Sequence, residues 1–408
     1  MYKTLLLIAG LFFLFSCSSS DNSPANDDPE EMIGNPQEGF LPCLDGMAGI
    51  YPCNGYDFLG QISLPSFGAS AGNDIWGWTD STTGKEYALG GLNNGTAFVD
   101  ISDTEDMIYL GKLPTATASS TLRDIKVYPD HAFIVSEAGG DGMQVYDLTR
   151  LINAENAPEN FEADTRYTGF GNAHNIVINE ASGYAYAVGT DTFNGGAHFV
   201  NIQDPKNPIA AGGYGANGYS HDAQVETYNG PDANYAGQEI FIGANENQVA
   251  IVNVTDKNNP QQISTFQYSN IGYTHQGWFS EDQRYFILGD ETDELTFGFD
   301  TRTLVFDLAD LENPILHTTY LGETAAIDHN GYVKGDDFYL ANYTAGVRIL
   351  DISGIDGETI VEEGFFDTYP LNNTAAFEGV WSVYPYFKSE KIIVNDINSG
   401  LFVIKKSN

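Results

Sequence analysis

The segment Ala97-Phe98-Val99-Asp100-Ile101-Ser102 is the first copy of a phrase that recurs along the chain. Each copy is a short apolar run, and every copy but the last ends in Asp or Asn. Further copies lie at residues 144–148, 199–202, 251–254, 305–308, 349–353 and 402–405, spaced 44 to 54 residues apart. A regular period of this length is typical of folds built from one repeated supersecondary unit.

Four short strands are expected in each repeat. In the first repeat, strands at residues 74–78 and 86–89 precede the recurring phrase, and a strand at 108–113 follows it. The 44 glycines, 24 tyrosines and many β-branched runs favour an all-β protein. Four-stranded sheets repeated around an axis protect their edges, which is how a propeller avoids exposed strands. The sequence therefore predicts an all-β, seven-bladed β-propeller.

The two ends of the repeat region complement each other. The last copy of the phrase lacks a fourth strand, whereas residues 58–65 (FLGQISLP) match the first repeat's fourth strand at 109–114 (YLGKLP). The strand at 58–65 is therefore expected to complete the last blade. The ring would then be closed by an N-terminal strand.

Three longer motifs carry a family resemblance. They are PCLDGMAGIYPC at residues 42–53, NDIWGW at 73–78 and THQGW at 274–278. Together with phrases that resemble LVIVD repeats, they make the chain similar to the choice-of-anchor B family from about residue 40 to the end. The resemblance implies a propeller displayed outside the cell on a variable anchor. It implies no established activity.

The first residues are those of an exported protein. Lys3 precedes an apolar run at 5–15, which is typical of a secretory signal and is shorter than the roughly 20 residues of a membrane span. Leu14-Phe15-Ser16-Cys17 resembles a lipobox, so we expect residues 1–16 to be a signal peptide and Cys17 to carry lipid. The alternative is a plain signal peptide cut elsewhere. Serines followed by acids after Cys17 resemble the export signal of surface lipoproteins in Bacteroidetes-type bacteria, which predicts an outer-membrane lipoprotein facing the cell exterior.

The segments between the signal and the propeller have different compositions. Residues 17–40 are mostly small, polar and acidic, as in a tether that cannot form a core. Segment 41–55 contains Cys43 and Cys53, which are expected to form a disulfide in an oxidising compartment. The alternative is two free thiols. The propeller is expected to occupy residues 56–408.

The net charge of −39, from 17 basic and 56 acidic residues, restricts the partners. A nucleic-acid-binding protein needs a basic face, so nucleic acid is excluded. Contact with the membrane is expected through the lipid anchor only. A glycan or a protein is the expected class of ligand.

Four of the seven histidines occupy one equivalent position. The aligned starts of the first strands are Asn73, Arg123, His174, His221, His275, His329 and Gly379. Pseudo-symmetry would direct the four imidazoles towards the propeller axis, where they would suit a transition metal such as Zn, Cu, Fe or Ni. The alternative is that these histidines are structural. The fixed charge of Arg123 opposes a cation there.

Other polar and aromatic residues are expected at the same mouth of the channel. They comprise the residues after the ring positions, the acids that end second strands, and three tryptophans. These residues are Asp74, Asp124, Asn175, Asp222, Gln276, Asn330, Glu137, Asp290, Glu291, Trp76, Trp278 and Trp381. The acidic run at 290–294, with Asp300 nearby, is interpreted as a solvated loop, with a Ca²⁺ site as the alternative.

Three functional interpretations remain. The first is a non-catalytic surface module that binds a polymer, a protein or an envelope component. The second is a metal-dependent enzyme with His174, His221, His275 and His329 as ligands, and Asp222 or a second-strand acid as general base. The third is a purely structural partner in a surface complex. The sequence has no His-Glu-x-x-His or phosphate-loop motif, which favours the first interpretation.

Overall fold

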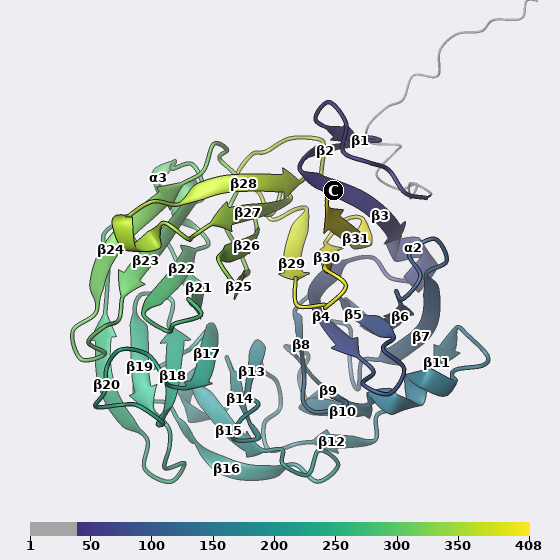
Figure 1. The fold of residues 1–408 in the computed structure, drawn as a ribbon. Coiled ribbons are helices and arrows are strands. Elements are labelled where there is room, and N and C mark those ends of the chain that lie inside the picture. Colours follow the sequence, from purple (N-terminus) through teal and green to yellow (C-terminus); the bar gives the residue numbers. More distant parts are fainter. Residues whose placement is uncertain (1–38) are drawn as a thin grey trace, which may run out of the picture.

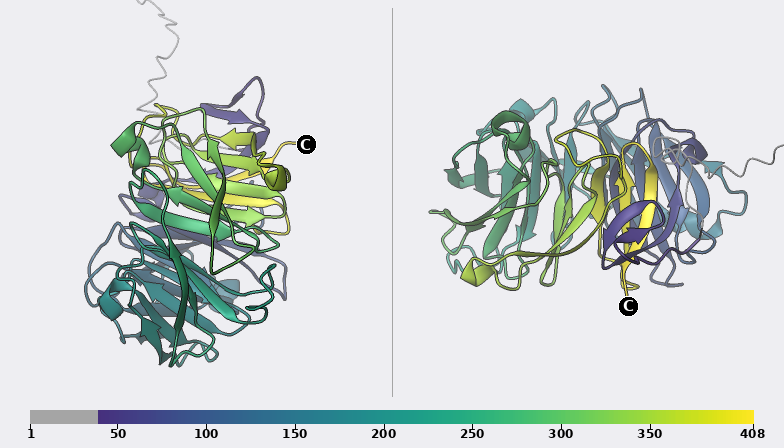
Figure 2. Two further views of the ribbon diagram at one scale, coloured as in Figure 1. Left: turned by 90° about the vertical axis from the view of Figure 1, so that its left-hand side faces the viewer. Right: turned by 90° about the horizontal axis from the view of Figure 1, so that it is seen from above.

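Seven antiparallel sheets lie like blades around one axis in the computed structural model, which describes residues 39–408 (Figure 1). Seen from the side, the strands run across the thickness of the ring (Figure 2). The predicted seven-bladed β-propeller is confirmed. The expected signal peptide, the lipid site at Cys17 and nearly all of the tether at 17–40 lie outside the described residues. Within residues 39–408, no helix has the length and apolar character needed to cross a membrane.

The first four blades follow the chain from the channel outwards. Blade one contains β4 (Gly72–Thr79), β5 (Glu86–Leu92), β6 (Gly95–Asp100) and β7 (Ile108–Pro114). Blade two contains β8 (Arg123–Val127), β9 (His131–Ser136), β10 (Met143–Asp147) and β12 (Thr165–Tyr167). Blade three contains β13 (Asn175–Asn179), β14 (Tyr184–Val188), β15 (Ala197–Asn201) and β16 (Ile209–Tyr214). Blade four contains β17 (Asp222–Thr227), β18 (Glu239–Ala244), β19 (Val249–Asn253) and β20 (Gln261–Phe266).

The last three blades complete the ring. Blade five contains β21 (Thr274–Phe279), β22 (Tyr285–Asp290), β23 (Arg302–Asp307) and β24 (Ile315–Leu321). Blade six contains β25 (Gly331–Lys334), β26 (Asp337–Ala341), β27 (Val347–Asp351) and β28 (Val361–Phe366). Blade seven contains β29 (Val380–Tyr384), β30 (Lys391–Asp396), β31 (Gly400–Lys406) and β3 (Tyr56–Ile62). Short helical turns are α2 (Leu64–Phe67), α3 (Asp293–Phe297), η1 (Leu148–Asn153), η2 (Phe193–Gly195) and η3 (Ile355–Gly357).

Strand β3 closes the ring as predicted. It pairs antiparallel with β31, from Tyr56 opposite Lys406 to Ile62 opposite Leu401 (Figure 1). The pairing shifts register between Phe58 and Gly60. The pairing of the third and fourth strands contains a similar bulge in blades one, three, four, five and six. A bulge increases local twist, so the outer strand of each blade bends in the same way.

Two additions extend blades beyond four strands. Strands β1 (Met47–Ala48) and β2 (Tyr51–Asn54) add to the outer edge of β28, next to the confirmed Cys43–Cys53 disulfide. In blade one, β11 (Glu159–Asn160) lies parallel to β7. Gly111 permits this approach, because it has a φ of +142° and an added Cβ would lie 2.1 Å from the Glu159 carbonyl oxygen. Both additions cover sheet edges that would otherwise be exposed.

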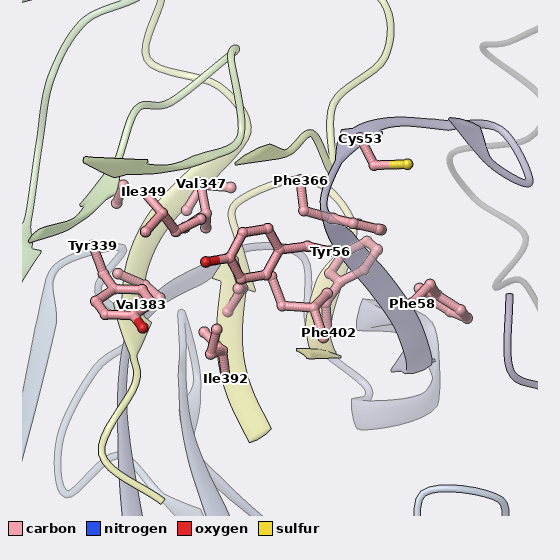
Figure 3. Close-up of a cluster of buried hydrophobic side chains, with 14 of the residues drawn as sticks. Cys53, Tyr56, Phe58, Tyr339, Val347, Ile349, Phe366, Val383, Ile392 and Phe402 are labelled. Carbon is pink, nitrogen blue, oxygen red and sulfur yellow. The ribbon is translucent and has the colours of Figure 1, made fainter. Parts of the chain in front are cut away.

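An aromatic cluster holds the closing strand against blade six. The ring of Phe58 lies 6.3 Å from both Phe366 and Phe402, and 5.7 Å from Tyr51, measured between ring centroids. All four side chains are buried (Figure 3 labels Phe58, Phe366 and Phe402). Burial of large aromatic surface is strongly stabilising, so this cluster joins the N-terminal strand, the last blade and its neighbour.

Candidate functional site

The central channel is lined by the first strands of the seven blades: β4, β8, β13, β17, β21, β25 and β29 (Figure 1). The predicted ring residues lie at the start of these strands, or just before it. We call the mouth that contains His174, His221, His275 and His329 the histidine face. The strands then run about 3.3 Å per residue towards the opposite mouth.

The four histidines lie one after another, each against the histidine of the next blade, and we call them the histidine row. Neighbouring imidazole centroids are 4.0 Å apart for His174 and His221, and 4.3 Å apart for His221 and His275 and for His275 and His329. Trp381 continues the row, with its ring centroid 4.8 Å from that of His329. The row follows from sequence, because four consecutive blades contribute a histidine and three do not.

Glu291, which follows β22, lies beside the middle of this row. One carboxylate oxygen is 3.7 Å from Nε2 of His275, and the other is 3.6 Å from Nε2 of His329. The hydroxyl of Tyr343 donates a hydrogen bond of 2.8 Å to Glu291. Ligand atoms of His221, His275 and Glu291 all lie within 4.8 Å of one another. This set differs from the predicted set of four histidines.

The buried histidines are neutral at physiological pH. Burial and the adjacent imidazoles lower the pKa of His221 well below its usual value. Burial, with a smaller effect of His174, lowers the pKa of His275 to about 3. Burial and the imidazole of His275 lower the pKa of His329 to about 3. Neutral imidazole is the form that binds metals.

Two adjacent ring positions, Arg123 and His174, have partners outside the set of His221, His275 and Glu291. Nδ1 of His174 lies 2.7 Å from a carboxylate oxygen of Glu137. Arg123 is buried, donates from Nε to the carbonyl of Leu92 at 3.3 Å, and has Nη1 3.9 Å from Asp141. The charge of Arg123 is therefore balanced within blades one and two, and Arg123 does not reach the histidine row as a free cation.

Four of the residues after the ring positions bond to neighbouring blades, although they were expected to face a ligand. Asp74 accepts a hydrogen bond of 3.1 Å from the backbone N–H of Ile125. The amide of Gln276 donates to the carbonyl of Gly331 and accepts from its N–H, at 3.1 and 3.0 Å. At the same position, Asp124, Asp222 and Asn330 are buried and Asn175 is half-buried. The side chains that satisfy backbone groups of a neighbouring blade are those of Asp74, Asp124, Asn175 and Gln276.

A buried charge cluster lies on the first strands of blades one and two. Nζ of Lys126 is 2.5 Å from Asp124 and 3.5 Å from Asp74. Burial acts to raise the pKa of Asp124, but Lys126 outweighs it and keeps that pKa below its usual value. Burial raises the pKa of Asp74 well above its usual value despite Lys126, and burial with the Asp124 carboxylate raises that of Asp222 to about 7. The cluster therefore has one firm ion pair, between Lys126 and Asp124.

The opposite mouth of the channel opens into an aromatic cavity of about 580 Å³. We call it the aromatic pocket. Its aromatic lining is Trp76, Trp278, Phe279, Tyr384 and Tyr386, and its polar lining includes Lys126, Glu180, Gln224, Glu226 and Glu281. Trp76 and Trp278 therefore lie at the opposite mouth from Trp381, and not with the histidines as expected. The reason is that both residues follow the ring position by three residues along their strands.

Sequence reasoning missed most of the aromatic pocket, although a simple signal was present. The third residue after each ring position forms a second ring along the same strands. Its members are Trp76, Lys126, Val177, Gln224, Trp278, Tyr332 and Ser382. Five of these seven residues line the pocket, and Tyr332 contacts both tryptophans with centroid distances of 5.8 and 4.9 Å.

The acidic run at 290–294 is not the solvated loop that was expected. Asp290, Asp293 and Glu294 are buried. Asp290 accepts hydrogen bonds from the backbone N–H groups of Gly272 and Tyr273, and Asp293 is paired with Arg302. Asp290 thus serves as an acceptor for a neighbouring loop, and Asp293 as the partner of a guanidinium group.

Comparisons with known proteins define the class by its fold. No family model matches the chain, and no curated protein matches it. The structure is similar to the β-propeller domain of Cps50 (Swd1) from Myceliophteria thermophila, with 10% identity over 81% of this chain and 96% of that chain, and a TM-score of 0.50. It is also similar to a putative 6-phosphogluconolactonase from Bacteroides uniformis, with 14% identity over 80% of this chain and 98% of that chain, and a TM-score of 0.54. The chain is a β-propeller.

Proposed function

We propose that the chain is an exported lipoprotein that presents its propeller outside the cell as a non-catalytic binding module. The basic start, the apolar run at 5–15 and Cys17 support export and lipid anchoring. The Cys43–Cys53 disulfide supports an oxidising compartment. We also propose membership of the choice-of-anchor B family, which rests on the motifs at 42–53, 73–78 and 274–278.

The aromatic pocket is the proposed ligand site, and its lining is the observation that carries the proposal. A volume of about 580 Å³ is in the range of small-molecule sites, which are usually of order 300–1,000 Å³. Trp278 and Tyr384 offer apolar ring surface, while Gln224 and Glu226 offer hydrogen-bonding groups. A sugar has both apolar C–H faces and hydroxyl groups, so a sugar unit of a glycan polymer matches this mixture.

Charge restricts the kind of sugar. The pocket contains three carboxyl side chains, Glu180, Glu226 and Glu281. Its cation, Lys126, is already paired with Asp124. An anionic polymer would bring like charges together in a partly desolvated site, which is unfavourable. The proposed ligand is therefore a neutral or amine-bearing glycan.

A glycan array followed by isothermal titration calorimetry tests this proposal on the purified full-length chain. We expect binding to neutral or amino sugars, and at least a tenfold loss of affinity in Trp278→Ala, because one wall of the pocket is removed. Trp381→Ala is the matched control, since Trp381 lies at the histidine face and should leave glycan affinity unchanged. Equal loss in both variants, or binding only to acidic glycans, would contradict the proposal.

A further inference from the structure

His275 lies in the middle of the histidine face without a hydrogen-bond partner. Its side chain is 1% exposed, and within residues 39–408 neither ring nitrogen has a hydrogen-bonding partner. A buried polar group without a partner is destabilising, and most such groups are paired in native proteins. The unpaired imidazole therefore calls for a partner that the described side chains do not provide.

The neighbouring side chains present lone pairs to the same place. Nδ1 of His221 lies 3.3 Å from the carbonyl oxygen of His275, and because a carbonyl only accepts, this nitrogen carries the proton. Nε2 of His221 is then the unprotonated atom. A backbone hydrogen bond on one ring nitrogen that leaves the other free is the usual arrangement of metal-binding histidines.

Glu291 adds an anionic ligand to the two imidazoles. We propose that His221, His275 and Glu291 form a binding site for one divalent first-row transition metal ion, such as Zn²⁺ or Fe²⁺. Their ligand atoms lie within 4.8 Å of one another. Metal–ligand bonds of about 2.0–2.2 Å require these atoms to approach by about an ångström. Rotation of the partly exposed Glu291 side chain can supply much of that movement.

The donor set restricts the ion. Two imidazoles and one carboxylate leave coordination positions open, as in zinc sites with two histidines and a glutamate and in non-haem iron sites. Hard ions such as Mg²⁺ and Ca²⁺ prefer all-oxygen ligands, so they should not compete. Tyr343 orients Glu291, because its hydroxyl donates a hydrogen bond of 2.8 Å to that carboxylate. This site lies at the opposite end of the channel from the proposed glycan pocket and does not depend on it.

Metal content is the direct test. The full-length chain, purified without a histidine tag, is incubated with Zn²⁺ or, anaerobically, with Fe²⁺ in excess Mg²⁺, dialysed, and analysed by elemental mass spectrometry. We expect close to one ion per chain in the wild type, and at least a tenfold weaker affinity in His275→Ala and Glu291→Gln. Whichever ion is retained at the lower free concentration identifies the preferred metal.

His317→Gln is the matched control. His317 lies on β24, the outer strand of blade five, where its Nε2 is 2.7 Å from the carbonyl oxygen of Ile355 in blade six, so it is remote from the channel. This variant should bind metal like the wild type. If His275→Ala does not fold, Glu291→Gln alone decides the question, because it keeps the size of a partly exposed side chain. Less than a tenth of an ion per wild-type chain, or equal metal content in Glu291→Gln and the wild type, would overturn the proposal.

Discussion

Replacing Lys126 with methionine should destabilise the propeller from inside its channel. Lys126 is buried, and its Nζ lies 2.5 Å from Asp124. At an effective dielectric constant near 20, this pair has an attraction of roughly 7 kcal/mol, much of which offsets the burial of both charges. Removing one partner of a buried pair typically costs about 3–5 kcal/mol, and we expect a loss in that range for Lys126→Met at pH 7.

Urea unfolding followed by circular dichroism measures this loss, and a second variant isolates its cause. In Lys126→Met/Asp124→Asn the stranded carboxylate is gone, so about half of the lost stability or more should return. The deficit of Lys126→Met should also shrink with acid. The pKa of Asp124 is lowered in the native protein, so its contribution is complete above the unfolded value of 3.8 and is lost as the pH falls below it. A loss under about 1 kcal/mol at pH 7, or no recovery in the double variant, would refute this reasoning.

Three further predictions concern the pocket, the closure and the N-terminal segment. Burial raises the pKa of Glu226 from 4.5 to about 7, and the hydrogen bond from Gln224 opposes this shift. Between these pH values the native state binds more protons than the unfolded state, so the free energy of unfolding falls as the pH rises from 4.5 to 7. Urea unfolding at several pH values should show that Glu226→Gln removes part of this fall, no more than about 3 kcal/mol. Phe58→Ala should lower the free energy of unfolding by about 3–5 kcal/mol, measured by urea unfolding, because it opens a cavity where β3 packs against blade six. A loss below about 1 kcal/mol would be inconsistent with closure of the ring by this strand. The double variant Cys43→Ser/Cys53→Ser removes a disulfide that joins residues 10 apart, and should lower the free energy of unfolding by about 2–3 kcal/mol. Backbone amides of β1 and β2 should then exchange hydrogen faster. Unchanged protection of these strands would contradict this prediction.

The fold was predictable because each blade repeats the same strand pattern. The phrase at 97–102 and its six later copies identified the third strand of every blade, and the match between 58–65 and 109–114 identified the closing strand. Both signals come from local sequence, since strand periodicity and turn residues are encoded within each repeat. The edge additions β1, β2 and β11 were not foreseen, because two- to four-residue strands carry too little pattern.

The candidate sites were only partly predictable. Alignment found that four consecutive blades place a histidine at one position, but it could not show that Glu291 turns towards His275. The alignment also placed Trp76 and Trp278 at the histidine face, whereas they line the aromatic pocket at the opposite mouth. The reason is that three residues of extended strand separate each tryptophan from its ring position. Whether an acidic residue such as Asp293 faces solvent or a buried guanidinium depends on contacts between distant segments, which no local pattern encodes.

A crystal structure of the chain grown with its best-binding glycan tests the central claim most directly. The proposal predicts electron density for a sugar unit in the aromatic pocket, in contact with Trp76 or Trp278 and hydrogen-bonded to Gln224 or Glu226. Sugar density at the histidine face or on the outer wall of the propeller, with the pocket empty, would contradict it.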